Sequence, residues 1–306
     1  MDSIPSIRGE AMHDQAQILR GLMEQRSEAA PADSTTAAPR AHTVTITSGK
    51  GGVGKSNLAL NLAIALGKVG HSVCLLDANL GLGNVDLLCG LNGYWNLSHV
   101  ISGARTLREI LLQGPAGIQV IPGASGLQDV ADCPRAAQTE ILAQLEELER
   151  SHEFLIIDTG TGIHRSVRQF VSAADMILIV TTPEPTSIAD AYATIKSLSA
   201  CAGLPEPQLL VNQADSPEQA REIIARVQHT ARTFLYASVG SAGFVPRDPA
   251  VVQAVNQRTP FVLQSPDAPA ARAVEQLARR VINLSHRQTV HSPFFSRFRH
   301  HPERAA

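Results

Sequence analysis

The 306-residue chain has few cysteines, no long apolar run and no surplus of either charge. Its four cysteines are widely spaced and none forms a CxxC pair, which argues against a zinc site or a disulfide framework and is typical of a reducing compartment. No run of eighteen apolar residues is present, and the N-terminal region carries acidic residues instead of an apolar core. We therefore expect neither a membrane span nor a signal peptide, and a cytoplasmic location.

The balance of charges restricts the class of partner. Lysine and arginine number 26 against 28 acidic residues, which gives a formal net charge of −2. Since no general basic field attracts the protein to phosphate backbones, DNA binding is not expected. The length allows one large α/β domain with tails.

A glycine-rich stretch, GKGGVGKS, occupies Gly49–Ser56. It follows an apolar alternating run at Val44–Ser48 and opens into Asn57–Leu66, whose apolar residues have helical spacing. Strand, glycine-rich loop and helix in this order are the context of a phosphate-binding P-loop, whose N–H groups surround an anion at the helix N-terminus. A glycine-rich turn that binds nothing is the alternative, and both flanks argue against it. The residues predicted to bind a nucleotide here are Gly49, Lys50, Gly51, Gly52, Val53, Gly54, Lys55, Ser56 and Asn57.

Two lysines lie in this loop, and they are given different roles. Lys55 is placed to neutralise the β- and γ-phosphates of a triphosphate, and the Ser56 hydroxyl to bind Mg²⁺. Lys50 is not part of the simple P-loop pattern. With it, the loop resembles the deviant Walker A motif of MinD/ParA-family ATPases. That resemblance implies ATP and Mg²⁺ as cofactors, a dimer in the ATP-bound state, and a Lys50 that reaches the nucleotide of the partner subunit.

Two apolar segments end in an aspartate. Leu155–Asp158 has the form of a Walker B strand, whose carboxylate lies within reach of the metal. Ser72–Asp77 ends in a second acid, which is expected to orient a metal-bound water. A helix-capping role is the alternative for Asp158, and beside a P-loop it has little weight. The residues predicted to hold the metal are Ser56, Asp77 and Asp158.

The segment Asp77–Asp86 resembles the family's switch I, usually DxDxGxxNxD, with one departure. Asn79 stands where the family has a second aspartate that positions the attacking water. An amide accepts a hydrogen bond from water, but it carries no charge to polarise it. The resemblance implies ATP hydrolysis, an activity of the EC 3.6 class, and Asn79 predicts that it is slow. The predicted catalytic residues are Lys50, Lys55, Asp77 and Asn79.

Further matches are to the FlhG group of this family, also called FleN or YlxH, the MinD-like regulators of flagellar number. DTGTGI at Asp158–Ile163 is similar to its DTGAGI, and Thr181–Thr186 matches its TTPEPT. The resemblance implies that Asn212 recognises the adenine amino group and that Pro246 is a second adenine contact. It also implies a role in flagellar number or placement, with a flagellar transcriptional regulator or switch proteins as partners.

The N-terminal 26 residues are separated from the P-loop by a linker. Residues 10–26 carry an amphipathic helical pattern, and residues 27–41 are rich in Ala, Pro, Ser and Thr, a composition typical of a flexible tether. The helix either packs on its own domain or binds a partner. Asp14–Arg20, DQAQILR, resembles the FlhG element that binds the SRP-type GTPase FlhF, which favours the partner.

From residue 42 to about 285, short apolar segments alternate with amphipathic helical ones. This pattern predicts a single α/β domain, a mainly parallel twisted sheet with helices on both faces, as in SIMIBI or MinD-like P-loop NTPases. The ligand of such a sheet lies at the carboxyl ends of its strands. The last strand is placed at Phe234–Val239. Predicted helices cover Ala136–Arg150, Ile188–Cys201, Glu218–Arg232 and Ala268–Asn283.

The C-terminal tail, residues 286–306, is basic and aromatic. In a helix over 293–301, Phe294, Phe295 and Phe298 share one arc flanked by arginines, as in a weak membrane-surface helix. Reversible association with the cytoplasmic face of the inner membrane through this tail is one interpretation. A tail that is disordered or packs on the domain is the other.

Two other functions of the same fold are alternatives. A ParA-like DNA-partitioning ATPase would need a basic patch, which the near-neutral charge does not indicate. A septum-placement ATPase of MinD type has the same nucleotide motifs and stays open. An iron–sulfur carrier would need a C-terminal CxxC, which the sequence lacks.

Overall fold

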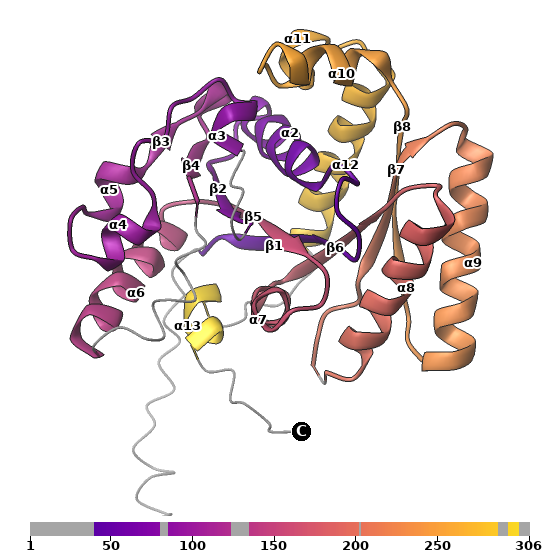
Figure 1. The fold of residues 1–306 in the computed structure, drawn as a ribbon, viewed down its shortest axis with the longest axis horizontal. Helices are drawn as coiled ribbons and strands as arrows, with labels where there is room; N and C mark the ends of the chain where they lie inside the picture. The colour runs from indigo at the N-terminus through magenta and orange to yellow at the C-terminus, as the bar shows by residue number, and fades with distance from the viewer. Residues whose placement is uncertain (1–39, 80–84, 124–134, 202, 287–292, 300–306) are drawn as a thin grey trace, which may run out of the picture. The chain divides into compact units, whose positions relative to one another are not determined.

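The computed structural model describes residues 40–79, 85–123, 135–201, 203–286 and 293–299. In these ranges eight strands form one sheet in the order β3-β4-β2-β5-β1-β6-β7-β8 (Figure 1). All pairings are parallel except β3 with β4. The strands are β1 His42–Ser48, β2 Val73–Ala78, β3 Leu112–Gln113, β4 Gln119–Ile121, β5 Phe154–Thr161, β6 Met176–Thr181, β7 Gln208–Ala214 and β8 Gly240–Pro246.

Helices cover both faces of this sheet (Figure 1). One face carries α2 and α12, and the other carries α6, α7, α8, α9 and α13. The helices are α2 Lys55–Lys68, α3 Val85–Leu88, α4 Leu97–Ile101, α5 Leu107–Ile110, α6 Arg135–Arg150, α7 Arg165–Ala173, α8 Pro185–Ser199, α9 Pro217–Leu235, α10 Pro249–Asn256, α11 Phe261–Gln264, α12 Pro269–Ser285 and α13 Phe294–Arg299. The predicted α/β fold with a mainly parallel sheet is confirmed.

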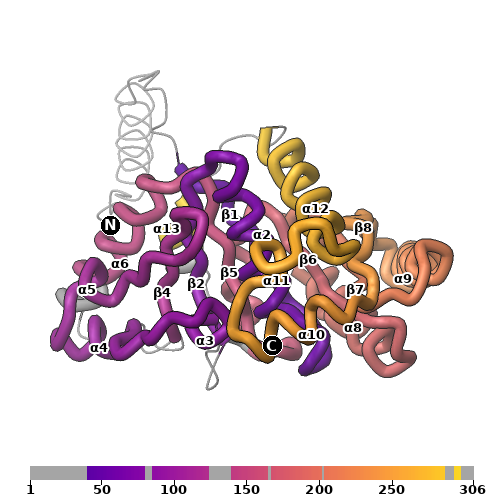
Figure 2. Tube along the Cα trace, turned by 90° about the horizontal axis from the view of Figure 1, so that it is seen from above, coloured from indigo at the N-terminus to yellow at the C-terminus, as the bar shows by residue number. Residues whose placement is uncertain are grey.

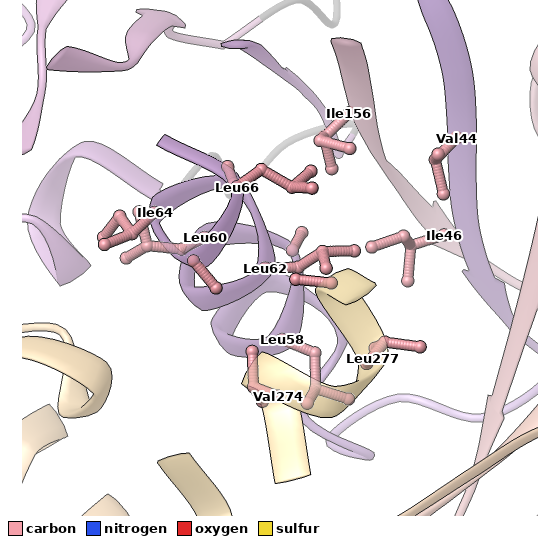
Figure 3. Close-up of a cluster of buried hydrophobic side chains, with 14 of the residues drawn as sticks. Val44, Ile46, Leu58, Leu60, Leu62, Ile64, Leu66, Ile156, Val274 and Leu277 are labelled. Carbon is pink, nitrogen blue, oxygen red and sulfur yellow. The ribbon is translucent and has the colours of Figure 1, made fainter. Parts of the chain in front are cut away.

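The core between α2 and the sheet is formed by side chains that alternate along the strands and point to one face. Val44 and Ile46 of β1 and Ile156 of β5 point to this face, where Leu62 and Leu66 of α2 lie toward them (Figure 3). Figure 3 also shows Val274 and Leu277 of α12 against the start of α2. Since α2 packs between the sheet and α12, its apolar residues are buried on nearly all sides. The packing holds the P-loop, which immediately precedes α2, in a fixed position.

The opposite face is divided in two by the threonines of β1. Thr43, Thr45 and Thr47 point to this face and are fully buried. The Thr45 hydroxyl donates to the carbonyl of Phe170 in α7, at 3.3 Å. The apolar residues on either side form two separate clusters, one with α4, α5, α6 and α13 and one with α8 and α9. Helix α7 contributes side chains to both clusters.

The four long predicted helices are present, and the predicted last strand is wrong. Phe234–Val239 was expected to be a strand, but α9 continues to Leu235 and the strand is β8, at Gly240–Pro246. The segment 237–246, ASVGSAGFVP, has few large apolar residues to mark a strand. The apolar residues at the end of α9 were therefore assigned to the strand that follows it.

The C-terminal helix α13 packs on the domain. Phe294 and Phe295 are fully buried, and Phe294 stacks on Phe170 of α7 with ring centroids 6.5 Å apart. Figure 2 shows α13 next to α6 and away from α10 and α11. These two rings therefore do not form the exposed apolar face that was expected to bind lipid. They lose contact with water by packing in the core of the domain instead. Lipid binding through 293–301 would first require α13 to leave this site.

The N-terminal helical pattern, 10–26, and the linker up to residue 39 lie outside the described residues. The domain boundaries proposed from the sequence therefore remain predictions. Within the described ranges, none of the helices combines the length and apolar character needed to cross a bilayer.

Candidate nucleotide-binding site

The P-loop turns from β1 into α2 with a backbone that glycine permits. Gly52 and Gly54 have φ values of 75° and 90°, in the left-handed region that side chains disfavour. Gly54 is the N-cap of α2, and no side chain caps its N–H groups. A helix N-terminus without a side-chain cap directs donors and a positive dipole end at an anion. The loop has the geometry expected of a phosphate site.

Two glycines of the loop are required by close packing. A Cβ on Gly49 would lie 2.3 Å from the backbone oxygen of Asp190 in α8. A Cβ on Gly54 would lie 2.5 Å from the amide nitrogen of Asn212. Both distances are far shorter than a van der Waals contact, so the loop approaches α8 and the end of β7 only because these residues lack side chains.

Lys55 begins α2 and is buried, with 5% of its surface exposed. Burial lowers its pKa, and the nearby Asp158 carboxylate partly opposes this shift. An ammonium group removed from water, with one carboxylate nearby, is a strong site for a further negative charge such as a phosphate.

Asp77 and Asp158 lie side by side because β2 and β5 are parallel and these residues are register partners. Both are buried. The pKa of Asp158 is raised to about 7, chiefly by burial and also by the neighbouring Asp77 carboxylate. Ser56 and Lys55 act in the opposite direction. Neither Asp158 oxygen has a hydrogen bond of ordinary geometry, so the carboxylate is placed where a cation would stabilise it.

Asn79 follows β2 directly and is partly buried. Its backbone N–H donates to Oδ1 of Asp77 at 3.2 Å, and the N–H of Val85 donates to Oδ2 at 3.3 Å. Asp77 thus accepts hydrogen bonds from two residues of the segment predicted to be switch I. The structure brings Asn79 to the same edge as the two carboxylates.

Lys50 points away from the P-loop toward the start of α8. Its ammonium group donates to the Glu184 carboxylate, and to the Thr186 hydroxyl at 2.9 Å. The lysine side chain is 35% exposed. Lys50 is therefore held at the surface by residues of the TTPEPT segment, whereas Lys55 is held inside.

A cavity of about 180 Å³ lies beside the P-loop. Asn212 borders it, and its amide nitrogen donates to the Val53 carbonyl at 2.7 Å, so the side chain is fixed against the loop. Pro246 borders it from the end of β8. The predicted base contacts are thus brought to one cavity with Asn57. The cavity is lined by Gly54, Asn57, Leu58, Asn212, Gln213, Val245, Pro246, Arg247, Asp248, Val251, Val252 and Phe261.

Sequence reasoning missed the outer wall of this cavity, which α10 and α11 form. Val252 of α10 is 63% exposed, and Phe261 is buried at the start of α11. Both helices are short, and no motif marks them. The sequence did not predict that Glu184 and Thr186 bind Lys50. Both residues lie in the TTPEPT motif, which indicated the family but no contact with the P-loop.

Comparisons with known proteins agree with this geometry. A family model described as ParA, NUBPL iron-transfer P-loop NTPase, matches residues 40–121. The chain is 38% identical to the antiactivator FleN of Pseudomonas aeruginosa, over 78% of this chain and 85% of FleN. It is 37% identical to the flagellum site-determining protein YlxH of Helicobacter pylori, over 62% of this chain and 64% of YlxH.

Among solved structures, the MinC:MinD cell division protein complex of Aquifex aeolicus is similar. Its TM-score is 0.64, with 26% identity over 82% of this chain and 98% of that chain. The chain therefore belongs to the ParA/MinD family of P-loop NTPases and, within it, is FlhG-like.

Proposed function

We propose that this protein is an ATP-dependent dimerising switch that regulates flagellar number or placement. The observation that carries the proposal is the separation of the two P-loop lysines. Lys55 is buried beside Asp158, while Lys50 lies at the surface of the same loop. A buried lysine serves the nucleotide of its own subunit, and a surface lysine on the same loop is placed to reach the nucleotide of a second subunit.

The site supports Mg-ATP as the ligand. The loop from Gly49 to Ser56 would bind the phosphates, and Asn212 and Pro246 would contact the adenine in the neighbouring cavity. Ser56, Asp77 and Asp158 would hold Mg²⁺. Asp158 fits this role because its buried carboxylate oxygens have no hydrogen bonds of ordinary geometry. The metal would supply neutralisation of charge on the phosphates.

We infer that hydrolysis is slow, and that the ATP-bound state is long-lived. Asn79 can accept a hydrogen bond from water but cannot act as a base. The Asp77 carboxylate accepts the N–H groups of Asn79 and Val85 in the switch segment, so Asp77 is engaged in holding that segment.

Sedimentation velocity tests the dimer. With Mg²⁺ and a non-hydrolysable ATP analogue, the wild type is expected to form a dimer, and with ADP it is expected to remain a monomer. Lys50→Ala should remain a monomer with either nucleotide. Lys196→Ala, which removes an exposed lysine of α8, is the matched control and should dimerise. A wild type that stays monomeric with the analogue would refute the proposal.

The flagellar role is supported by the similarity to FleN and YlxH over most of the domain. Deleting the gene is expected to change the number or position of flagella per cell, and the Lys50→Ala variant should fail to restore them. Filament counts by electron microscopy that do not differ between the deletion strain and its parent would contradict this role.

The N-terminal DQAQILR element is proposed to contact an SRP-type GTPase of the FlhF kind. A peptide of residues 8–26 should accelerate GTP hydrolysis by the GTPase encoded in the same genome. A peptide with the same composition in scrambled order is the control. Equal rates with the two peptides would remove this partner from the proposal.

A function in iron transfer is not favoured, although the matching family model carries that description. The sequence has no CxxC pair among Cys74, Cys89, Cys133 and Cys201. Burial raises the pKa of Cys74 to about 12, and burial together with the nearby Asp86 carboxylate raises that of Cys89 to about 12. Both thiols therefore stay protonated and are poor metal ligands.

A further inference from the structure

We propose that Asn61 is a positioning residue for the base of the nucleotide, acting through the wall formed by α10 and α11. This inference rests on the proposed nucleotide function. Asn61 lies in the second turn of α2 and does not line the cavity. It is fully buried, in a helix whose other buried residues, apart from Lys55, are apolar. A buried amide is tolerated only where its donors and acceptor are used.

The Asn61 side chain uses both ends of its amide on residues of the site. Its nitrogen donates to the backbone oxygen and to Oδ1 of Asn57, both at 2.8 Å. Its oxygen accepts the N–H of Val262 at 3.0 Å. Asn57 borders the cavity on the P-loop side, and Val262 directly follows Phe261, which borders it on the outer side. One side chain therefore fixes the spacing between two opposite walls.

The hydrogen bond between Asn61 and Val262 caps the N-terminus of α11 with a side chain from α2. Helix α11 is four residues long and has Pro260 at its N-cap, which offers no side-chain hydrogen bond. The first N–H groups of a helix lack partners within it. Asn61 satisfies one of them, so the amide adds a directional contact to the apolar packing of Phe261 and Val262 that holds α11 against α2.

Other contacts hold the same wall at its edges. Asp248 accepts the N–H of Ala250 in α10 at 2.9 Å and the N–H of Ala270 in α12 at 3.0 Å. Lys68, two turns after Asn61 on α2, donates to the Val262 carbonyl at 3.4 Å and to Glu275 at 2.9 Å. The wall thus has a buried central attachment, Asn61, and a partly exposed one, Lys68.

These contacts predict a selective defect. Loosening the wall should affect the adenine, which the cavity would hold, and leave the phosphates, which the loop at Gly49–Ser56 would hold. Calorimetric titrations with Mg-ADP and with Mg-pyrophosphate separate the two parts of the ligand. ADP is chosen because the proposed dimer forms with ATP, so dimerisation does not contribute to the heat.

Asn61→Leu is expected to weaken ADP binding at least tenfold and to change pyrophosphate binding less than threefold. Lys68→Met should weaken ADP binding two- to fivefold, again without an effect on pyrophosphate. Lys196→Met removes a lysine of α8 that lies outside the cavity lining, and should bind both ligands as the wild type does.

Equal loss of ADP and pyrophosphate binding in Asn61→Leu would assign Asn61 to the general stability of α2 and overturn the inference. So would ADP binding at the wild-type affinity. If Asn61→Leu does not give a cooperative melting transition, Lys68→Met decides, since its partly exposed side chain is not needed for the core. A wild type that binds neither ligand would refute the proposed nucleotide function instead.

Discussion

Arg40 and Arg297, from the two ends of the domain, donate to the same carboxylate oxygen, Oδ1 of Asp175, at 3.0 and 2.8 Å. Asp175 precedes β6 and is almost fully buried. Glu149, from the last turn of α6, accepts the N–H groups of Phe294 and Phe295 at 2.8 and 3.3 Å. The start of the domain and its C-terminal helix are thus joined by one buried set of charges, which stabilises the docked position of α13.

Replacing Phe295 with alanine should destabilise the domain because the ring is fully buried. Loss of a buried phenylalanine costs about 3–5 kcal/mol, from lost burial and the cavity left behind. Phe234→Ala is the matched control, since that ring is 70% exposed. Urea denaturation should show a large loss for the first variant and less than about 1 kcal/mol for the second. Equal losses would mean that α13 does not dock as described.

Acid should destabilise the protein through His42. Burial lowers the pKa of His42 to about 4 from 6.5; Asp175 opposes this shift, and Arg40 and Arg297 add to it. The unfolded chain therefore binds a proton below pH 6.5 that the folded protein does not, and stability falls as the pH falls from 6.5 toward 4. Lowering the pH from 7 to 5 should remove about 2 kcal/mol through this residue.

His42→Gln should lose less stability over the same range, and urea titrations at pH 7 and 5 measure the difference. Glu149 acts in the opposite direction. Burial raises the pKa of Glu149, so its contribution to stability is present below pH 4.5 and is lost as the pH rises from 4.5 through that raised pKa. Glu149 and Asp175 are present in both the wild type and the His42→Gln variant, so the comparison isolates the effect of the histidine. An identical pH dependence for the variant and the wild type would contradict this explanation.

Adding a methyl group at Gly49 should disrupt the P-loop, because it would meet the backbone of Asp190 at 2.3 Å. Gly51→Ala is the control, since its nearest neighbour, the Thr161 methyl group, would lie at 3.9 Å. Thermal melting should show a lower midpoint for Gly49→Ala and almost no change for Gly51→Ala. Two variants with the wild-type midpoint would show that the loop and α8 are farther apart than described.

Asn79→Asp should raise the rate of ATP hydrolysis by at least tenfold, because a carboxylate can polarise the attacking water where an amide cannot. Steady-state phosphate release measures the rate. Asn92→Asp, which adds the same charge at an exposed position after α3, controls for charge alone. If Asn79→Asp hydrolyses ATP at the wild-type rate, Asn79 is not at the water site.

The sequence was sufficient for the parts of the site that are local. The P-loop is continuous in sequence, and the two strands that end in Asp77 and Asp158 are marked by apolar residues. Their lateral contact follows once the sheet is known to be parallel. The strand order itself, which makes β2 and β5 neighbours, depends on pairings between distant segments that periodicity does not encode.

The parts that could not be predicted depend on tertiary contacts. Phe294 and Phe295 have the same helical arc in a lipid-binding helix and in a docked one. The contacts that favour docking, with Phe170, Glu149 and Asp175, come from residues far away in sequence. The role of Asn61 could not be predicted either. A single amide in an apolar helix has no motif around it, and its hydrogen bond to the distant Val262 is known only from the structure.

Calorimetric titration of the purified wild type with ATP at millimolar Mg²⁺ tests the central claim most directly. We expect a heat of binding with one nucleotide per chain, and no heat for Lys55→Ala, which lacks the buried ammonium group. A wild type that gives no heat of binding under these conditions would contradict the account.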